Sequence, residues 1–260
     1  MNILDKIVIR KLEEVAEAKQ KVSVAELEAN PNFSRKPLFF KDFLLDENRT
    51  GIISEFKRRS PSKGLINGTA DVAEVTQAYN LAGASALSVL TDTDFFGGKA
   101  DDLFKARAVN QIPILRKDFM IDEYQILEAK AWGADIILLI ASILTPQQIA
   151  DFGKLAQSLG LSVLLEVHDL AELERSISPH LDAIGVNNRN LGNFTVNIQT
   201  SFDLVNKIPA EFLKISESAI DNPQVIKELK AVGYNGFLIG ENFMKTDNPG
   251  NAIKEFVVEL

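Results

Sequence analysis

The chain has 260 residues, of which 46% are hydrophobic and 25% are charged, a composition that is ordinary for a globular protein. It contains no cysteine, which excludes disulfides, thiolate nucleophiles and cysteine-based metal sites. The formal net charge of −8 argues against a general nucleic-acid binder and against binding to an acidic membrane surface.

The start of the chain shows no targeting signal. The first residues lack the basic start and the continuous apolar stretch of a secretory signal peptide. The longest apolar run, residues 136–141, is too short to span a bilayer. We therefore expect a cytoplasmic protein with no membrane partner and no nucleic-acid partner.

Residues 1–46 precede the first predicted strand and form an N-terminal extension. Within them, Leu4, Ile7, Val8, Leu12 and Val15 recur at helical spacing. This pattern predicts at least one helix. The extension could close one end of the fold or shield a substrate, and the sequence leaves both roles open.

Eight apolar segments in the rest of the chain predict β-strands, at residues 51–57, 85–91, 113–119, 134–142, 161–167, 183–189, 213–218 and 236–243. Most are near-continuous apolar runs, which is typical of parallel strands covered on both faces. Helix-start signals lie between them, at Thr145-Pro146, Asp71, Asp169 and Asn222-Pro223. Helix ends are predicted at the glycines before four of the strands, Gly83, Gly133, Gly160 and Gly233.

Eight strands that alternate with helices predict a (β/α)8 TIM barrel of the α/β class. We expect one barrel domain over residues 1–260, with 1–46 as its N-terminal helical extension. A doubly wound open sheet is the alternative. It usually has fewer strands, however, and no G-x-G-x-x-G motif follows any predicted strand.

Polar and ionised residues stand where several of these strands end. Side chains two apart on a strand share a face, and ionised groups are rarely buried unless they are paired. If the shared faces point into the barrel, one mouth collects Glu55, Lys57, Lys117, Glu166, Asn187 and Arg189. Two lysines crowded against two glutamates perturb one another's pKa and can supply both a general acid and a general base. The alternative is a set of structural ion pairs that fills the barrel top.

Further charged and aromatic residues are expected at the same mouth. The loop at residues 57–64 is cationic and rich in turn-forming residues, so it reads either as a lid over an anionic substrate or as a solvated turn. Small residues after the seventh and eighth strands are typical of a barrel phosphate site. The residues expected near the mouth are Arg58, Arg59, Lys63, Arg116, Ser218, Ala219, Gly240, Glu241 and the aromatic pair at 95–96. His168 and His180 share no metal-binding spacing.

At these residues the sequence closely resembles the indole-3-glycerol-phosphate synthase family of tryptophan biosynthesis. The resemblance is carried by residues 54–64 (SEFKRRSPSKG), 88–92 (SVLTD), 115–119 (LRKDF) with 122–125 (DEYQ), 165–169 (LEVHD), 185–191 (GVNNRNL) and 216–218 (SES). It implies a (β/α)8 barrel with an N-terminal extension. It also implies a lyase that converts 1-(2-carboxyphenylamino)-1-deoxyribulose 5-phosphate to indole-3-glycerol phosphate, with loss of carbon dioxide and water and with no cofactor or metal.

The resemblance assigns roles to individual residues. Lys117 is implied as the general acid of ring closure, and Glu166 and Glu55 as the acid–base carboxylates of later proton transfers, with Lys57 and Asn187 assisting. The division of the dehydration step among Lys57, Glu55 and Glu166 stays open. Substrate binding is implied for Ser60, Phe96, Phe119, Arg189, Leu191, Ser218, Ala219, Gly240 and Glu241.

The sequence departs from the family at two positions. Ala219 stands where the family usually has glycine, so a positive φ there would cost energy. Lys99 replaces a usual serine after Gly98, which we interpret as loop variation. The alternatives are an aldolase-type barrel with Lys117 as Schiff-base nucleophile, a barrel isomerase of the same pathway, and a non-catalytic barrel that binds a phosphorylated ligand. Contacts with other pathway enzymes are not indicated by the sequence.

Overall fold

A computed structural model describes residues 2–190, 192 and 194–260. In this part of the chain, eight parallel strands close into a barrel in the order β1-β10-β9-β8-β7-β6-β5-β4. The strands are β1 (Ile52–Phe56), β4 (Ala86–Leu90), β5 (Ile114–Lys117), β6 (Ile136–Ile140), β7 (Ser162–Val167), β8 (Ala183–Asn187), β9 (Leu213–Glu217) and β10 (Gly236–Ile239). The predicted (β/α)8 barrel is therefore confirmed.

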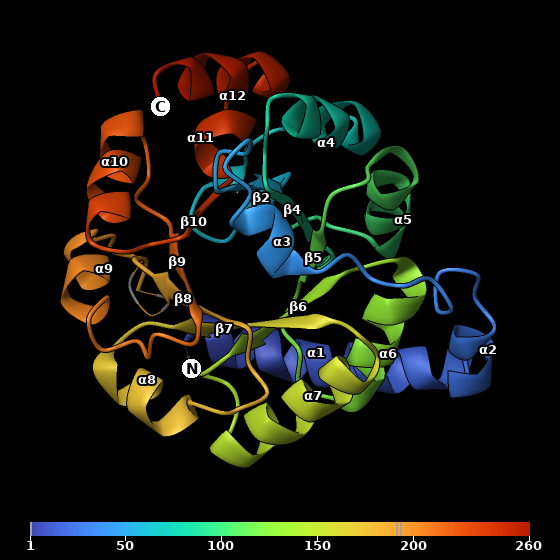
Figure 1. The fold of residues 1–260 in the computed structure, drawn as a ribbon. Helices are drawn as coiled ribbons and strands as arrows, with labels where there is room; N and C mark the ends of the chain where they lie inside the picture. Colours follow the sequence, from blue (N-terminus) through green and yellow to red (C-terminus); the bar gives the residue numbers. More distant parts are fainter. Residues whose placement is uncertain (1, 191, 193) are drawn as a thin grey trace.

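Helices surround the barrel, as Figure 1 shows. They are α4 (Val72–Leu81), α5 (Ala100–Val109), α6 (Glu123–Trp132), α7 (Pro146–Ser158), α8 (Leu170–Ser176), α9 (Gln199–Leu204), α10 (Pro223–Ala231), α11 (Glu241–Met244) and α12 (Pro249–Val258). The predicted starts are confirmed, because Thr145, Asp71, Asp169 and Asn222 each accept a backbone N–H as N-caps. The four predicted helix-end glycines all have positive φ. None of the helices described is long and apolar enough to cross a membrane.

The period of two along each strand divides the apolar residues into two layers. Ile52, Leu87 and Ile137 belong to the layer between the sheet and the helices. Ile53, Leu115 and other inward-facing residues fill the barrel interior. Complete burial of one such side chain contributes about 1.5–3 kcal/mol, so the alternating pattern stabilises both faces of the sheet at once.

The N-terminal extension forms α1 (Ile3–Lys21), α2 (Val24–Glu28) and α3 (Phe40–Leu44) and covers both ends of the barrel. Phe40 and Leu44 of α3 join the interior cluster, and Leu44 lies against Gly236, the first residue of β10. Helix α3 thus closes the end where the strands begin, the near end in Figure 1. Ile7 of α1 joins the same cluster, which also holds Phe119, the second residue after β5. Helix α3 therefore closes one end of the barrel, as one of the two interpretations held, and α1 lies at the opposite end.

The predicted helix in the extension is confirmed as α1, but the predicted end of the last strand is wrong. The last strand ends at Ile239 rather than at residue 243, because the chain turns at Gly240 into α11. Leu12 does not belong to the buried face of α1, since it is 59% exposed, whereas Lys11 is 3% exposed. A lysine takes the apolar face because three carboxylates surround its ammonium.

Asp135, directly before β6, anchors the extension to the barrel. Its carboxylate is fully buried and pairs with Arg107 at 2.8 Å and with Arg35 of the extension at 2.8 Å. It also accepts the backbone N–H of Ile114 at 2.9 Å and of Leu38 at 2.7 Å. One buried charge therefore holds α5, β5 and the segment that leads into α3.

Replacing Asp135 by alanine leaves Arg107 buried without its partner. We expect Asp135→Ala to lower the free energy of unfolding by about 3–5 kcal/mol, measured by urea denaturation. Asp101→Ala is the matched control, because Asp101 pairs with Lys105 at 2.8 Å on the surface of α5, where a pair contributes about 0–1 kcal/mol. Equal losses in the two variants would contradict the anchoring role.

Candidate active site

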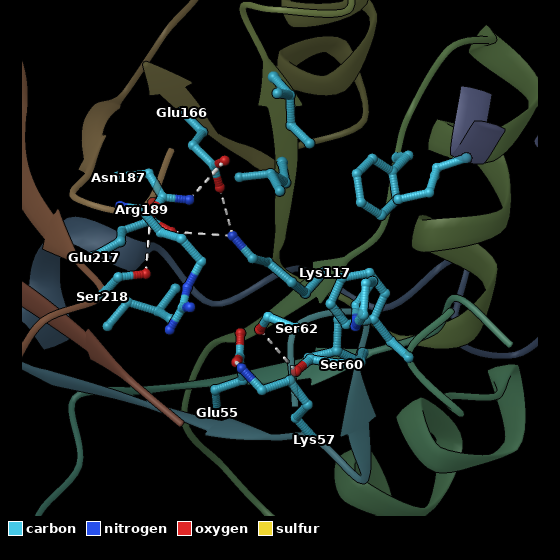
Figure 2. A pocket seen from close by; sticks show the side chains of 18 of the residues that line it. Glu55, Lys57, Ser60, Ser62, Lys117, Glu166, Asn187, Arg189, Glu217 and Ser218 are labelled. Atoms are coloured by element: carbon cyan, nitrogen blue, oxygen red, sulfur yellow. Dashed lines mark hydrogen bonds and ion pairs between the residues drawn. The ribbon is translucent and has the colours of Figure 1, made fainter. Parts of the chain in front are cut away.

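A cavity opens where the strands end. Figure 2 shows that its labelled side chains converge from several strands on one space. The residues singled out from the sequence that line it are Glu55, Lys57, Ser60, Phe96, Lys117, Phe119, Glu166, Asn187, Arg189, Ser218 and Glu241. Ala219 and Gly240 line an adjoining recess. Leu191, also expected to bind substrate, lies outside the described residues.

Lys117 lies at the centre of this cavity between two carboxylates. Its Nζ is 2.7 Å from Oε2 of Glu166 and 3.0 Å from Oε2 of Glu217. Asn187 Nδ2 donates to the other oxygen of Glu166 at 3.0 Å, and Ser218 Oγ donates to Asn187 Oδ1 at 3.0 Å. This chain of contacts joins the ends of β5, β7, β8 and β9 (Figure 2).

The buried charges in this group change one another's pKa. Burial disfavours the charge on Lys117, but the carboxylates of Glu166 and Glu217 outweigh burial and raise its pKa. Burial likewise opposes an ionised Glu166, but the Lys117 ammonium holds the pKa of that carboxyl well below its usual range. For Glu217, burial and repulsion from Glu166 outweigh the attraction of Lys117 and raise the pKa to about 7. At neutral pH the site therefore holds an ammonium, an ionised carboxylate and a carboxyl that exchanges its proton.

His168, one residue after β7, stands behind Glu166. Its Nε2 is 3.3 Å from Oε1 of Glu166, and its Nδ1 is 3.0 Å from Oε2 of Glu172 on α8. Burial lowers the pKa of His168, but the two carboxylates outweigh that effect and raise the pKa to about 10. The imidazolium thus adds a second positive charge beside Glu166.

Glu55 and Lys57 form a second ion pair at the mouth. Lys57 Nζ donates to Oε1 of Glu55 at 2.6 Å, and Glu55 is 3% exposed. Gly240 approaches Glu55 so closely that a Cβ there would lie 2.5 Å from Oε1. The absence of a side chain at position 240 therefore gives the Glu55 carboxylate its room.

Glu217 is a buried cavity residue to which the sequence assigned no role. It stood only within the motif at residues 216–218, although Ile215 and Glu217 share a strand face. Ile215 lies in the barrel interior, and Glu217 is 1% exposed. The alternation along β9 could have identified this third carboxylate.

The expectation that Arg116 lies at the mouth is wrong. Arg116 precedes Lys117 on β5, so its side chain points to the opposite face of the strand, toward the helices. There it donates to the backbone oxygen of Gln125 at 2.8 Å and to the Glu128 carboxylate at 3.1 Å. Arg58 is also turned away, because it pairs with Asp102 of α5. Arg59 is exposed. The positive charges that line the cavity come instead from Lys57, Lys117 and Arg189.

The recess beyond Arg189 has an unusual backbone. Ser218 and Ala219 have φ values of 65° and 61°, in the left-handed region. The positive φ that was expected to strain Ala219 is therefore present. Arg189 and Lys63 each lie 3.4 Å from the Glu241 carboxylate at the rim.

Two aromatic rings and a short hairpin complete the cavity. The rings of Phe96 and Phe119 have centroids 5.8 Å apart and define what we call the aromatic wall. The loop after β1 forms an antiparallel hairpin of β2 (Arg59–Ser60) and β3 (Gly64–Leu65). Its turn places Ser60 and Ser62 at the cavity (Figure 2). Among residues 2–190, 192 and 194–260, no cluster of three or more His, Cys, Asp or Glu side chains could hold a metal ion.

Known proteins with similar sequences agree on one family. A family model described as indole-3-glycerol phosphate synthase matches residues 4–256. A protein of that name from Bacteroides thetaiotaomicron is 45% identical over 256 residues, which cover 98% of each chain. Relatives of the same name from Acidovorax sp. and Bordetella pertussis are each 42% identical, over 264 and 259 residues, and cover 98% of this chain and 98% and 99% of theirs.

Solved structures with low sequence identity support the fold alone. An N-acetylmannosamine-6-phosphate 2-epimerase from Clostridium perfringens has a TM-score of 0.59 at 16% identity, over 84% of this chain and 96% of its own. A mandelate oxidase variant has a TM-score of 0.58 at 12% identity, over 80% and 71%. The sequence matches decide the family: with 42–45% identity over nearly the whole length, the chain belongs to the indole-3-glycerol phosphate synthase family.

Proposed function

We propose that the cavity converts 1-(2-carboxyphenylamino)-1-deoxyribulose 5-phosphate to indole-3-glycerol phosphate, with Lys117 as the general acid of ring closure. The family activity is that of a carboxy-lyase, and it does not favour the aldolase, isomerase or non-catalytic alternatives. The observation that carries the proposal is the Lys117 ammonium held between Glu166 and Glu217 in the cavity at the barrel mouth. The family match supports the further proposal that the chain works in the cytoplasm on a small phosphorylated molecule.

Ring closure brings the aromatic carbon onto the substrate's carbonyl carbon, and negative charge develops on the carbonyl oxygen. A positioned ammonium can protonate that oxygen and stabilise its charge. The raised pKa of Lys117 keeps it protonated at neutral pH. A Schiff-base lysine needs an unprotonated amine, so the same environment argues against Lys117 as a nucleophile.

The later steps are loss of carbon dioxide and loss of water. Loss of carbon dioxide restores the aromatic six-membered ring, because the electrons of the broken bond return to it. Loss of water then needs a proton donor for the departing hydroxyl group and a proton acceptor for the hydrogen that leaves as the double bond of the new five-membered ring forms. We assign these transfers to Glu166 and Glu55, with Lys57 and Asn187 assisting through the contacts described above. The low pKa of Glu166 keeps it ionised at neutral pH, so it carries no proton before the transfer.

The two anionic groups and the aromatic ring of the substrate need separate contacts. We assign the phosphate to the recess formed by Ser218, Ala219 and Gly240, where backbone N–H groups can approach an anion. Ser60 and Arg189 are assigned to its other polar groups. The aromatic wall of Phe96 and Phe119 is assigned to the anthranilate ring, which suits the apolar part of the cavity lining.

Removal of the Lys117 ammonium tests the proposed acid. We expect Lys117→Ala to lower turnover at least about 100-fold, because general acid catalysis contributes about 10²–10⁴ in rate. Turnover is followed by indole fluorescence with the carboxyphenylamino-deoxyribulose phosphate as substrate. Lys105→Ala, a change on the surface of α5, should keep wild-type turnover.

Two outcomes would contradict the role of Lys117. One is a folded Lys117→Ala variant that keeps more than a tenth of the wild-type rate. The other is a covalent adduct on Lys117 after borohydride reduction in the presence of substrate, which would support the Schiff-base alternative.

The charge on His168 predicts a pH-dependent stability. Its folded pKa of about 10 lies above the ordinary value of 6.5, so its contribution is complete below pH 6.5 and is lost as the pH rises through about 10. We expect His168→Gln to lower the free energy of unfolding by a few kcal/mol at pH 6 and by much less at pH 10.

Urea denaturation at the two pH values measures this difference. His180→Gln is the comparison for loss of an imidazole whose Nδ1 faces the Gln157 amide at 3.0 Å. A His168→Gln effect of the same size at pH 6 and pH 10 would show that the imidazole is not held as a cation by Glu166 and Glu172.

A further inference from the structure

Lys11 is a buried cation on a helix outside the barrel. It lies in the middle of α1 and is 3% exposed. Its Nζ is 2.9 Å from Oδ2 of Asp92, 2.9 Å from Oδ1 of Asp118 and 2.6 Å from Oε2 of Glu14. Burial opposes its charge, but Asp118 and Asp92 outweigh burial and raise its pKa. A buried ion pair is costly to form and is weak evidence of stabilisation by itself, so what its partners hold in place matters more.

Both aspartates organise the backbone of the aromatic wall. Asp92 Oδ1 accepts the backbone N–H of Phe95 at 2.9 Å and of Phe96 at 3.1 Å. Asp118 Oδ1 accepts the backbone N–H of Phe119 at 2.8 Å. One ammonium thus joins the two carboxylates that fix the backbone at both ring-bearing residues.

Helix α1 reaches the cavity on the same face. Ile7, one turn before Lys11, lines the cavity together with Ile3 and Leu4. The contact between Lys11 and the barrel therefore sets the position of α1 as well as the relative position of Phe96 and Phe119. Asp118 also pairs with Arg116, whose Nη2 lies 3.1 Å from Oδ2 of Asp118. Asp92 pairs with Lys11 through its Oδ2.

We infer that Lys11 is a positioning residue for catalysis, which acts through Asp92 and Asp118 to hold the aromatic wall against the substrate's ring. The inference rests on the proposed function, because it takes the wall as the contact for the anthranilate ring. A misplacement of about 1 Å can lower a reaction rate by about 10²-fold. The wall determines where the attacking carbon stands relative to the carbonyl, so its geometry enters both KM and kcat.

A double-mutant cycle tests this route. We expect Lys11→Met to lower kcat/KM by about 10- to 100-fold, with a raised KM. Phe96→Leu removes one ring of the wall directly. If Lys11 acts through the wall, the double variant should lie within about twofold of the worse single variant, because coupled residues are not additive. If the fold-losses in kcat/KM of the two single variants multiply in the double variant, the inference is overturned. A folded Lys11→Met variant with unchanged kcat and KM would also overturn it.

Lys19→Met is the matched control for loosening α1. Lys19 pairs with Asp122 at 2.7 Å and ties the same helix to the start of α6, away from the aromatic wall. It should leave kcat and KM within twofold of wild type. A loss of kcat/KM equal to that of Lys11→Met would show that Lys11 only anchors α1, and would overturn the inference. If wild type itself gives no indole fluorescence, the proposed function fails, and this outcome is distinct from failure of the Lys11 role.

A second variant keeps the test decisive if Lys11→Met does not fold. Lys11→Arg retains the positive charge among the three carboxylates, but its larger, planar head moves Asp92 and Asp118 apart. We expect a kcat/KM between those of Lys11→Met and wild type, with the same non-additivity against Phe96→Leu. A kcat/KM of Lys11→Arg within twofold of wild type would contradict the inference in that case.

Discussion

The structure of the site depends on one buried ammonium that is shared by two unequal carboxylates. Lys117 lies at the top of the barrel interior, above the apolar layer that contains Leu115 and Ile53. Because one lysine cannot fully compensate both Glu166 and Glu217, one carboxyl keeps its charge and the other holds its proton more tightly. Electrostatic competition thus gives two chemically identical side chains different pKa values.

The barrel makes this arrangement possible through simple geometry. Parallel strands end at one mouth, and the period of two directs every second side chain inward. The same strands bury apolar residues on their other face against the helices. The fold is therefore stabilised by the outer layer and the lower interior, which leaves the upper interior free for the charged groups of the cavity. The extension follows the same division, with α3 under the apolar end and α1 beside the polar mouth.

The sequence was sufficient for the fold and for most of the cavity, because both follow from periodicity. The alternation of side chains along each strand correctly placed five residues at the cavity, namely Glu55, Lys57, Lys117, Glu166 and Asn187. Arg116 was misplaced because it was grouped by its neighbour rather than by its face. The positions of α1 and α3 could not be predicted, since helical spacing identifies an apolar face but not the surface it meets. The burial of Lys11 could not be predicted, because a lysine on such a face is explained only by carboxylates that lie far away in the chain.

Titration of the cavity carboxyls is the most direct test of this account. Carbon-13 NMR of protein labelled at the glutamate carboxyl carbons, with Glu217→Gln and Glu166→Gln used for assignment, measures each pKa. The account predicts that Glu217 titrates near pH 7 and that Glu166 stays ionised well below the range of an ordinary glutamate. If both carboxyls titrate together near the ordinary value of 4.5, Lys117 does not separate their pKa values, and the account is wrong.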